Sequence, residues 1–401
     1  MKYYFSCCFV LILSLMVRAD NPRGIVEGNN KFAFRLFADL KSGNDKNLFC
    51  SPFSISTALA MVYAGARDET ALQMSRTMNF QQGNQFHAEY KSLLDRLSNG
   101  TEGQIKLNIA NGLWAQKDFR FLDTYLDIVR SDYGSELKNV DFTNVGEREK
   151  TRKEINAWVE RKTNDKIKDL LGQNDLEDLT RLVLVNAIYF YGEWANPFEK
   201  ALTAPQDFFL LDQGRVKTPF MNGHGRYRYY EDSDIKALEI PYRDDKASMV
   251  IFLPDKTGGI VEFEKSFNYK YYLEIIDSLQ FKNVRLSLPK FQTTFKIDLE
   301  NILSQMGMPL AFSSGGADFS GMTGKRDLCI SKVIHQAFIN VAEKGTEAAA
   351  ATAVIMKMTA IGPSSDTKIF IADHPFIFII KDNATGSILF MGRIMKPDVS
   401  K

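Results

Sequence analysis

The stretch that most constrains this 401-residue chain lies near its C-terminal end, at residues 343–360. Its sequence, EKGTEAAAATAVIMKMTA, holds four consecutive alanines with Glu and Lys nearby, a composition that favours helix because alanine loses no side-chain entropy there. The flanks at 333–341 and 369–371 are instead apolar and β-branched, as strands are. A segment whose own preference conflicts with that of its surroundings is typical of a conformational switch, and we predict one here.

Several motifs together resemble one known family. The sequence EKGTEAAAAT (343–352) is similar to the hinge of the inhibitory serpins, and IADHPFIF (371–378) to the segment that follows their reactive loop. Further blocks agree in order along the chain, namely SPFSIS (51–56), LVNAIYFYGEW (184–194), LPKF (288–291) and DFSGM (318–322). The resemblance covers nearly all of the chain after its first two dozen residues. It implies the α+β serpin fold, with about nine helices, three β-sheets and an exposed reactive-centre loop at about 343–363.

Hydrophobic periodicity also predicts an α+β fold. Apolar residues recur at helical spacing between 34 and 62, and further helices are expected at 69–78, with Asp68 as N-cap, and at 85–97, 122–133 and 146–162. Strand-like runs cover 105–114, 181–191, 237–240, 248–253, 284–288, 330–341, 369–380 and 388–394. Since no Pro-, Gly- or Ser-rich linker is long enough to divide the chain, we predict a single domain at 20–401.

The first nineteen residues resemble a secretory signal peptide. Lys2 precedes an apolar run at 3–17, and Ala19 offers a small residue for cleavage. A membrane anchor is the less favoured alternative, because the run is shorter than the roughly 20 residues that a span needs. We therefore predict a signal peptide at 1–19 and a secreted, extracellular protein, or a periplasmic or cell-envelope one in a bacterial source.

Two further expectations depend on that compartment. Cys50 and Cys329 lie far apart on apolar segments, and such isolated cysteines are more often buried thiols than halves of a disulfide. Asn99 and Asn383 each begin an N-x-T sequon and are candidates for glycosylation in a eukaryotic host.

The sequence lacks the motifs of the common enzyme classes, including G-x-S-x-G, H-E-x-x-H, the P-loop and C-x-x-C. Four histidines are present: His335 is expected in mid-strand, His87 on a polar helix, His224 in a glycine-flanked turn, and His374 lies between Asp373 and Pro375. A catalytic triad is defined by geometry and roles, so the mere presence of Ser, His and Asp does not predict one. We predict that the chain is not an enzyme and uses no cofactor or metal.

The charge distribution argues against polyanionic partners. The net charge is +1, which gives no overall field for nucleic acid or an anionic membrane. Some serpins bind heparin through the helix that corresponds to 85–97, but here Lys91 and Arg96 are balanced by Glu89 and Asp95, so we predict no heparin site. The cluster RYRYY at 226–230 is interpreted as a solvated strand face. A monomer is expected.

The resemblance implies a suicide inhibitor of serine proteases, with cysteine proteases as a second class of target. A protease would cleave the loop and form an acyl-enzyme, and the freed hinge would then insert as a new strand into the central sheet. Strand alternation would place Thr346, Ala348, Ala350 and Thr352 on one face, where small side chains fit between neighbouring strands. Gly345 would serve as the pivot. The hinge residues are Glu343, Gly345, Thr346, Glu347, Ala348, Ala349, Ala350 and Ala351.

The resemblance also implies two sets of residues that control insertion. Ser51, Ser54, Asn186 and His335 would form a polar cluster beneath the strands, which we call the sheet-opening cluster. Trp194, Lys290 and Glu343 would lie where the loop first enters the sheet, and we call them the loop-entry site. The alternative for these sets is a satisfied polar core and an ordinary surface ion pair.

Counting from Glu343 as serpin loops usually run places Thr359 before the scissile bond and Ala360 after it. A slip of one or two residues would make Met358 or Lys357 the recognised side chain. Met358 or Thr359 suits an elastase-like or chymotrypsin-like pocket, whereas Lys357 suits a trypsin-like one, so a broad inhibitor is a reasonable hypothesis. The alternative is a non-inhibitory serpin that acts as carrier, storage protein or chaperone.

Overall fold

The near-continuous apolar run at 181–191 forms the middle of the central sheet. The computed structural model describes residues 22–42, 45–83, 85–100, 105–346 and 366–398, without the side chain of Asn99. Strand β4 (Leu182–Glu193) is buried along most of its length. It pairs in parallel with β11 (Lys332–Ala342) and antiparallel with β2 (Ile105–Gln116). The sheet order is β10-β11-β12-β4-β2-β3, completed by β10 (Phe291–Asp298), β12 (Gly345–Thr346) and β3 (Leu137–Val140).

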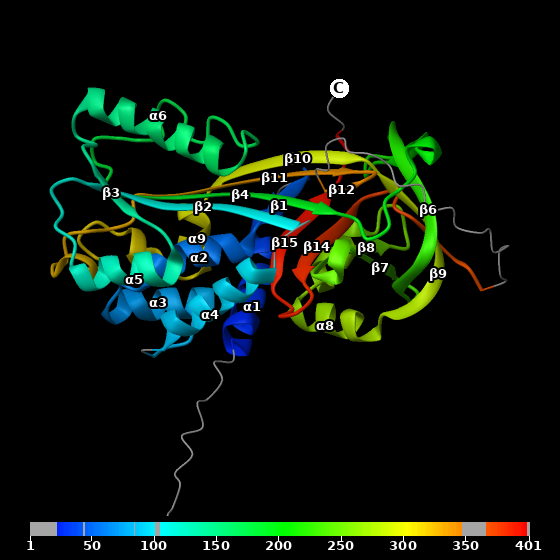
Figure 1. Ribbon diagram of the computed structural model, residues 1–401, viewed down its shortest axis with the longest axis horizontal. Helices are drawn as coiled ribbons and strands as arrows, with labels where there is room; N and C mark the ends of the chain where they lie inside the picture. Colours follow the sequence, from blue (N-terminus) through cyan, green and yellow to red (C-terminus); the bar gives the residue numbers. More distant parts are fainter. Residues whose placement is uncertain (1–21, 43–44, 84, 101–104, 347–365, 399–401) are drawn as a thin grey trace, which may run out of the picture.

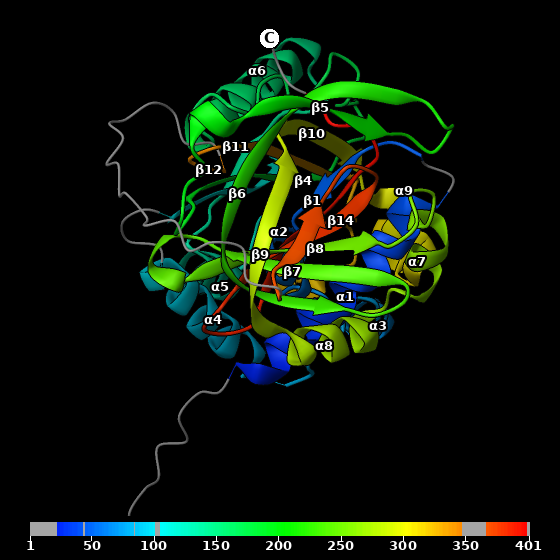
Figure 2. The ribbon, with the colours of Figure 1, turned by 90° about the vertical axis from the view of Figure 1, so that its right-hand side faces the viewer.

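A second sheet of nine strands fills the other end of the molecule (Figures 1 and 2). Its order is β1-β15-β14-β8-β7-β6-β9-β13, and β5 pairs with β6 beside this path. Its strands are β1 (Leu48–Cys50), β5 (Ala204–Phe209), β6 (Arg215–Glu231), β7 (Ile235–Pro241), β8 (Ala247–Pro254), β9 (Gln280–Pro289), β13 (Lys368–Ile371), β14 (Phe376–Asp382) and β15 (Ile388–Ile394). The described strands therefore form two hydrogen-bonded sheets instead of the three expected. The 17-residue strand β6 pairs with β5, β7 and β9 and so joins these strands into one sheet.

The helices pack on both faces of the central sheet. Figure 1 shows α2 and α5 below it and α6 above it. The described residues form ten α-helices, one more than the approximate number expected: α1 (Arg23–Lys41), α2 (Pro52–Tyr63), α3 (Asp68–Met78), α4 (Phe86–Gly100), α5 (Asp123–Tyr133), α6 (Val145–Lys162), α7 (Ile260–Ser266), α8 (Tyr269–Ser278), α9 (Glu300–Met306) and α10 (Ser320–Thr323). Short 3-10 turns lie at Lys200–Leu202, Arg243–Asp245 and Pro309–Phe312.

Two hydrophobic cores divide the side chains of β4 between the faces of the sheet. Val183 and Val185 pack under α6, in a core that also contains Trp114 and Val159. The even-numbered residues of β4, such as Leu184, point the other way, into the main core beneath the sheet. Burial of each such side chain contributes about 1.5–3 kcal/mol, so this face strongly disfavours a polar group without partners. Asn186 lies on this face and is fully buried, so its amide needs hydrogen bonds.

Three local expectations were wrong. The run 369–380 is divided into β13 and β14, because Pro375 has no N–H to offer a ladder and the ring of His374 bonds to the carbonyl of Pro254 at 2.7 Å. His224 lies within β6 and not in a turn, since this segment pairs with β9 throughout. Asp68 is the first residue of α3, and the N-cap position belongs to Arg67, which makes no side-chain capping bond.

Other expectations agree with the described residues. Cys50 and Cys329 are free thiols, and Cys50 is buried. The segment 226–230 is part of β6, although Tyr227 and Tyr229 are buried there instead of solvated. Among the described helices, none combines the length and the apolar character that a membrane span requires.

Candidate hinge and sheet-opening site

The start of the hinge already lies between two strands of the central sheet. The parallel pairing of β4 and β11 runs from Val183 opposite Lys332 to Tyr189 opposite Phe338. Beyond this point β12 lies between them: Thr346 pairs with Gly192 of β4 on one side and with Val341 of β11 on the other. Both pairings are antiparallel. The sheet therefore holds the hinge residues Gly345 and Thr346 as a short extra strand at the place where β4 and β11 separate (Figure 2).

Glycine is required at position 345 because the backbones of β12 and β4 approach each other closely there. A Cβ atom at this position would lie 2.1 Å from the carbonyl oxygen of Gly192 and 2.7 Å from the Cα of Glu193. Real atoms do not approach so closely, so any other residue would push β12 away from β4. The pivot that the sequence predicts is thus a residue whose missing side chain lets the hinge enter the sheet.

Thr346 faces inward, as strand alternation predicts for this hinge position. Its side chain is fully buried, and its hydroxyl forms a 2.7 Å hydrogen bond with the hydroxyl of Tyr242. The Tyr242 ring stacks on Trp194, with centroids 4.5 Å apart and planes 13° from parallel. The Trp194 indole N–H in turn donates to the carbonyl oxygen of Ala342, at 3.0 Å. Thr346 is therefore fixed to an aromatic pair that is itself hydrogen-bonded to the end of β11.

The other members of the loop-entry site form an ion pair. Lys290 Nζ lies 2.8 Å from Glu343 Oε2, and the two side chains are 25% and 12% exposed. Thr203 donates a second hydrogen bond to Glu343 at 3.1 Å. Burial alone would raise the pKa of Glu343, but the bonds from Lys290, the backbone and Thr203 together lower the pKa below its usual value. The pair connects the first hinge residue to Lys290, directly before β10.

The four residues of the sheet-opening cluster meet beneath β4 and β11. Asn186 of β4 lies opposite His335 of β11, and Ser51 and Ser54 come from the start of α2. The Asn186 amide nitrogen donates to the carbonyl oxygen of Ser54 at 3.1 Å and also to its hydroxyl. The Ser51 hydroxyl accepts from Ser54 N–H as the helix N-cap and donates to the carbonyl of Leu389 in β15. The cluster thus joins both sheets to α2.

The partners of His335 fix its protonation state. The Ser51 N–H donates to Nε2 at 3.2 Å, and a backbone N–H can only donate, so Nε2 carries no proton. The proton is on Nδ1, which bonds to the Asn186 side-chain oxygen. The ring is fully buried, and this burial lowers the pKa of His335 to about 3. His335 is therefore a neutral donor and acceptor that bridges Asn186 and the first residues of α2.

Asn111 is a further member of this site that the sequence did not reveal. It lies on β2 opposite Asn186, and its side-chain oxygen accepts a hydrogen bond from the Asn186 amide. A single asparagine in a strand-like run carries no pattern that would distinguish it from a solvated position. Only the antiparallel register of β2 against β4 brings the two asparagines together.

Several predicted site residues lie outside the described residues. These are the hinge residues from Glu347 to Ala351 and the candidate scissile-bond residues Lys357, Met358, Thr359 and Ala360. The Asn99 side chain is also outside them. The Asn383 amide nitrogen donates to the carbonyl of Asp245 at 2.9 Å and to the Ser248 hydroxyl at 2.9 Å. A glycan on this nitrogen would have to displace those bonds, so the folded geometry disfavours Asn383 as an attachment site.

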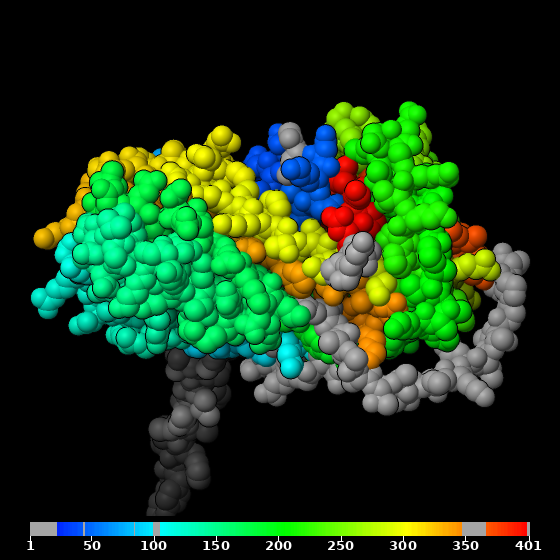
Figure 3. All heavy atoms as spheres, turned by 90° about the horizontal axis from the view of Figure 1, so that it is seen from above, coloured from blue at the N-terminus to red at the C-terminus, as the bar shows by residue number. Residues whose placement is uncertain are grey.

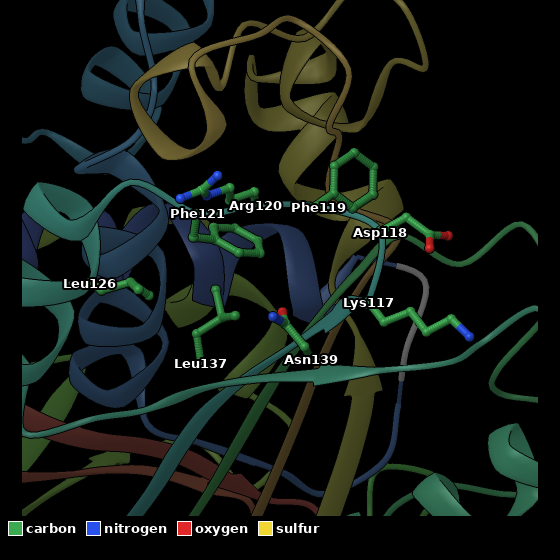
Figure 4. A pocket seen from close by; sticks show the side chains of 8 residues that line it. All are labelled: Lys117, Asp118, Phe119, Arg120, Phe121, Leu126, Leu137 and Asn139. Atoms are coloured by element: carbon green, nitrogen blue, oxygen red, sulfur yellow. The ribbon is translucent and has the colours of Figure 1, made fainter.

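A surface pocket of about 370 Å³ lies between the end of β2, α5 and β3 (Figure 4). Its lining contains no histidine, cysteine or serine and so offers no nucleophile with an adjacent base. Lys117 at its rim pairs with Asp141 at 2.8 Å. Among the described residues, no three His, Cys, Asp or Glu side chains gather as a metal would require. The pocket is lined by Lys117, Asp118, Phe119, Arg120, Phe121, Leu126, Leu137 and Asn139.

Known proteins resemble this chain over nearly its full length. A family model described as Serpin (serine protease inhibitor) matches residues 27–397. The human leukocyte elastase inhibitor is 40% identical over 92% of this chain and 98% of its own. The solved structure of Serpin48 from the insect Tenebrio molitor matches with a TM-score of 0.83 and 32% identity, over 95% of this chain and all of that one. The solved structure of human thyroxine-binding globulin in complex with thyroxine matches with a TM-score of 0.84 and 31% identity, over 94% of this chain and 100% of that one.

These matches confirm the predicted α+β serpin fold. They also confirm that the chain is not an enzyme, because the family comprises protease inhibitors. The extent of the match, together with a hinge that enters the central sheet between β4 and β11, leads to one conclusion: the chain belongs to the serpin family.

Proposed function

We propose that this protein is a suicide-substrate inhibitor of serine proteases, which traps the acyl-enzyme by inserting its cleaved loop into the central sheet. The observation that carries the proposal is the position of β12, whose two residues are already paired with both β4 and β11. Insertion after cleavage would lengthen a strand that has already begun. A protease attached to the loop would then be carried along the sheet.

The register of β12 specifies where each inserted residue would lie. Thr346 is opposite Gly192 and Val341, so six residues farther along Thr352 would lie opposite Asn186 and His335. These are the two residues whose side chains bond to each other in the uncleaved protein. The same register would place Thr352 on the buried face that Thr346 occupies. The Thr352 hydroxyl could replace the hydrogen-bond partner that Asn186 and His335 each lose when β4 and β11 separate.

The energetics of insertion are favourable. A dozen inserted residues would add about ten backbone hydrogen bonds, each worth roughly 0.5–1.5 kcal/mol. The total, on the order of 10 kcal/mol, is comparable with the stability of a typical domain, about 5–15 kcal/mol. The uncleaved form would therefore be held by a kinetic barrier. The sheet-opening cluster and the loop-entry site supply contacts that insertion must break.

The target class is proposed from the loop sequence. Thr359 or Met358 would suit elastase-like or chymotrypsin-like proteases, and Lys357 would suit trypsin-like ones. The 40% identity to a leukocyte elastase inhibitor supports the first class. Mass spectrometry of the loop after reaction with elastase and with trypsin would locate each cut. Cuts far from residues 357–360 would rule out this assignment.

A covalent complex is the decisive test of inhibition. The protein should form a complex with a serine protease that survives denaturing gel electrophoresis, whereas a carrier or storage protein would only be cleaved. The small residues of the hinge at 345–353 favour inhibition over a carrier role, because large or charged residues on the inserted face would resist burial. A panel of elastase, chymotrypsin, trypsin and a papain-like cysteine protease covers the proposed targets. Cleavage by every protease without any complex would exclude the inhibitory function.

We also propose that the protein is secreted as a monomer after cleavage behind Ala19. The apolar segment at 3–17 and the small residues before position 20 support this proposal. N-terminal sequencing of protein recovered from the medium would test it. Recovery only from cells, with residues 1–19 retained, would contradict secretion.

A further inference from the structure

The outer face of β6, β9 and β13 carries side chains that neither the core nor the hinge uses. In this three-stranded region His224 of β6 lies opposite Arg285 of β9, which lies opposite Ile369 of β13. Side chains two residues apart on each strand share this face. We define the β6–β9–β13 face by His224, Arg226, Phe281, Arg285, Ile369 and Ile371.

Apolar side chains are unusually exposed here. Phe281 is 61% exposed, Ile369 54% and Ile371 38%, whereas Phe370 between the two isoleucines is fully buried. The guanidinium of Arg226 lies over the Phe281 ring, 5.2 Å from its centroid, which holds both side chains in place. Large exposed apolar side chains grouped with polar ones are typical of protein interaction sites.

The β6–β9–β13 face is positively charged, and among the described residues no carboxylate forms an ion pair with its arginines. Neighbouring basic residues have carboxylate partners: Arg228 pairs with Glu239 at 2.7 Å, and Lys368 pairs with Glu231. Within the described part of the chain, Arg226 and Arg285 form no such pair. The β6–β9–β13 face therefore presents two guanidinium groups beside exposed apolar side chains, and its complement is an acidic surface with apolar neighbours.

The face adjoins the segment that a protease would bind. β13 begins at Lys368, eight residues after Ala360, and eight extended residues span at most about 28 Å. A protease domain of about 230 residues has a diameter of roughly 45 Å from its expected radius of gyration. A protease bound at 359–360 must therefore reach over neighbouring surfaces of this protein. Figure 3 shows that β13 (red-orange, at the right) and β6 (green) border each other on the surface at this end of the molecule.

We propose that the β6–β9–β13 face is a docking surface for the target protease, and that it binds an acidic loop with adjacent apolar side chains near the protease active site. This proposal rests on the inhibitory function proposed above. Arg226 and Arg285 would increase the rate of encounter, because complementary charges mainly affect association. Phe281, Ile369 and Ile371 favour a protein over a linear polyanion as the partner, since a polyanion would not cover them.

The charge-reversal double variant Arg226→Glu/Arg285→Glu tests the electrostatic contribution to protease docking. The rate constant for covalent complex formation is measured at low and high salt, with the protease that wild type inhibits fastest. We expect a rate about tenfold lower than wild type at low salt and a weaker salt dependence. The number of inhibitor molecules consumed per protease should stay unchanged, because insertion is not affected. The matched control Arg130→Glu/Lys270→Glu places the same charge change on α5 and α8 and should react at the wild-type rate.

Ile369→Thr tests the contribution of apolar contacts to protease docking. Threonine is also β-branched, so the strand propensity of β13 is kept while apolar contact is reduced. We expect a rate about threefold lower, with the wild-type salt dependence. Thermal unfolding of each variant, compared with wild type, identifies any loss of rate that comes from misfolding.

The outcomes separate the docking surface from the inhibitory function. If wild type forms covalent complexes but both β6–β9–β13 variants react at the wild-type rate, the docking proposal is wrong and the proposed inhibitory function stands. If heparin affinity or self-association depends on these residues while the rate does not, the face serves a polyanion or a second copy, and the proposal is overturned. If wild type forms no complex with any protease, both proposals fall together.

Discussion

Asn186 and His335 lie opposite each other on the parallel strands β4 and β11, and the His335 ring donates a hydrogen bond to the Asn186 side-chain oxygen. This bond joins the two strands that loop insertion would have to separate. Both residues are fully buried, and their remaining bonds reach Ser51, Ser54 and Asn111. The contact therefore couples strand separation to the loss of several buried hydrogen bonds.

Replacing Asn186 should make the sheet easier to open. Asn186→Ala leaves His335 without its acceptor and should lower the free energy of unfolding by about 1–3 kcal/mol. It should also accelerate the binding of a synthetic peptide with the sequence of residues 346–357, measured by fluorescence of a labelled peptide. Asn156→Ala is the control, because Asn156 is a buried asparagine on α6 that bonds to Leu171 and makes no hydrogen bond to His335. Equal acceleration in both variants would show that general destabilisation, and not the β4–β11 contact, controls opening.

Mild acid should destabilise the uncleaved protein through His335. Its pKa is about 3 in the folded state, against about 6.5 for an unfolded histidine. The unfolded chain therefore binds more protons below pH 6.5, and stability falls as pH decreases from 6.5 towards 3, by about 2 kcal/mol at pH 5. Chemical unfolding at pH 7 and pH 5 measures this loss, which His335→Gln should reduce.

A second histidine with a lowered pKa provides the control for that experiment. Burial also lowers the pKa of His87, to about 4, and His87 lies on α4, away from β4 and β11. His87→Gln should likewise reduce the acid sensitivity of unfolding. If protonation of His335 also opens the sheet, wild type should bind the peptide faster at pH 5 than at pH 7. His335→Gln should lose this acceleration, whereas His87→Gln should keep it. If His335→Gln bound peptide with the full wild-type dependence on pH, His335 would not be the group that links acid to sheet opening.

The Lys290–Glu343 ion pair should restrain the start of the hinge. Glu343→Gln removes the charge of a mostly buried carboxylate and should reduce stability by about 2 kcal/mol. Because β12 follows directly, we expect faster self-association on warming, measured by light scattering. Asp298→Asn removes an ion pair with Lys332 at 3.2 Å in the same sheet and should not change the rate. Identical rates for the two variants would contradict a role for Glu343 at the loop entrance.

Thr346→Arg should convert the inhibitor into a substrate. The Thr346 side chain is already fully buried in β12 of the intact protein, so a guanidinium at this position would lose its hydration there and should displace β12, from which the inserted strand would extend. The loop should still be cleaved, but the covalent complex should disappear. Glu347→Arg, which strand alternation places on the opposite face, is the matched control and should keep most of the activity. Full inhibition by Thr346→Arg would contradict insertion from this position.

The sequence predicted the elements of the central sheet better than the contacts between them. β4 and β11 are long apolar runs, and tertiary packing agrees with their local preference. His224 was misassigned because the glycines on either side of it suggest a turn. The structure uses one of these glycines for packing instead: a Cβ at Gly225 would lie 3.0 Å from the Tyr227 ring.

Within the site, motif resemblance identified the residues that the structure brings together. It could not provide the network of bonds, because Asn111 and Tyr242 join the site only through strand pairing and ring stacking. The register of β12 was also beyond local sequence patterns. Without that register, Thr352 is one small residue among several, and its expected position opposite Asn186 and His335 could not be inferred.

The difference in thermal stability between intact and cleaved protein tests the stored energy most directly. The protein is cut once within the loop, and unfolding of both forms is followed by calorimetry. Stabilisation on the order of 10 kcal/mol should raise the midpoint by about 10–15 °C in a domain of this length, and cleaved Thr346→Arg should show no such rise. A cleaved wild-type protein that unfolds at the same temperature as the intact one would contradict insertion as the source of inhibition.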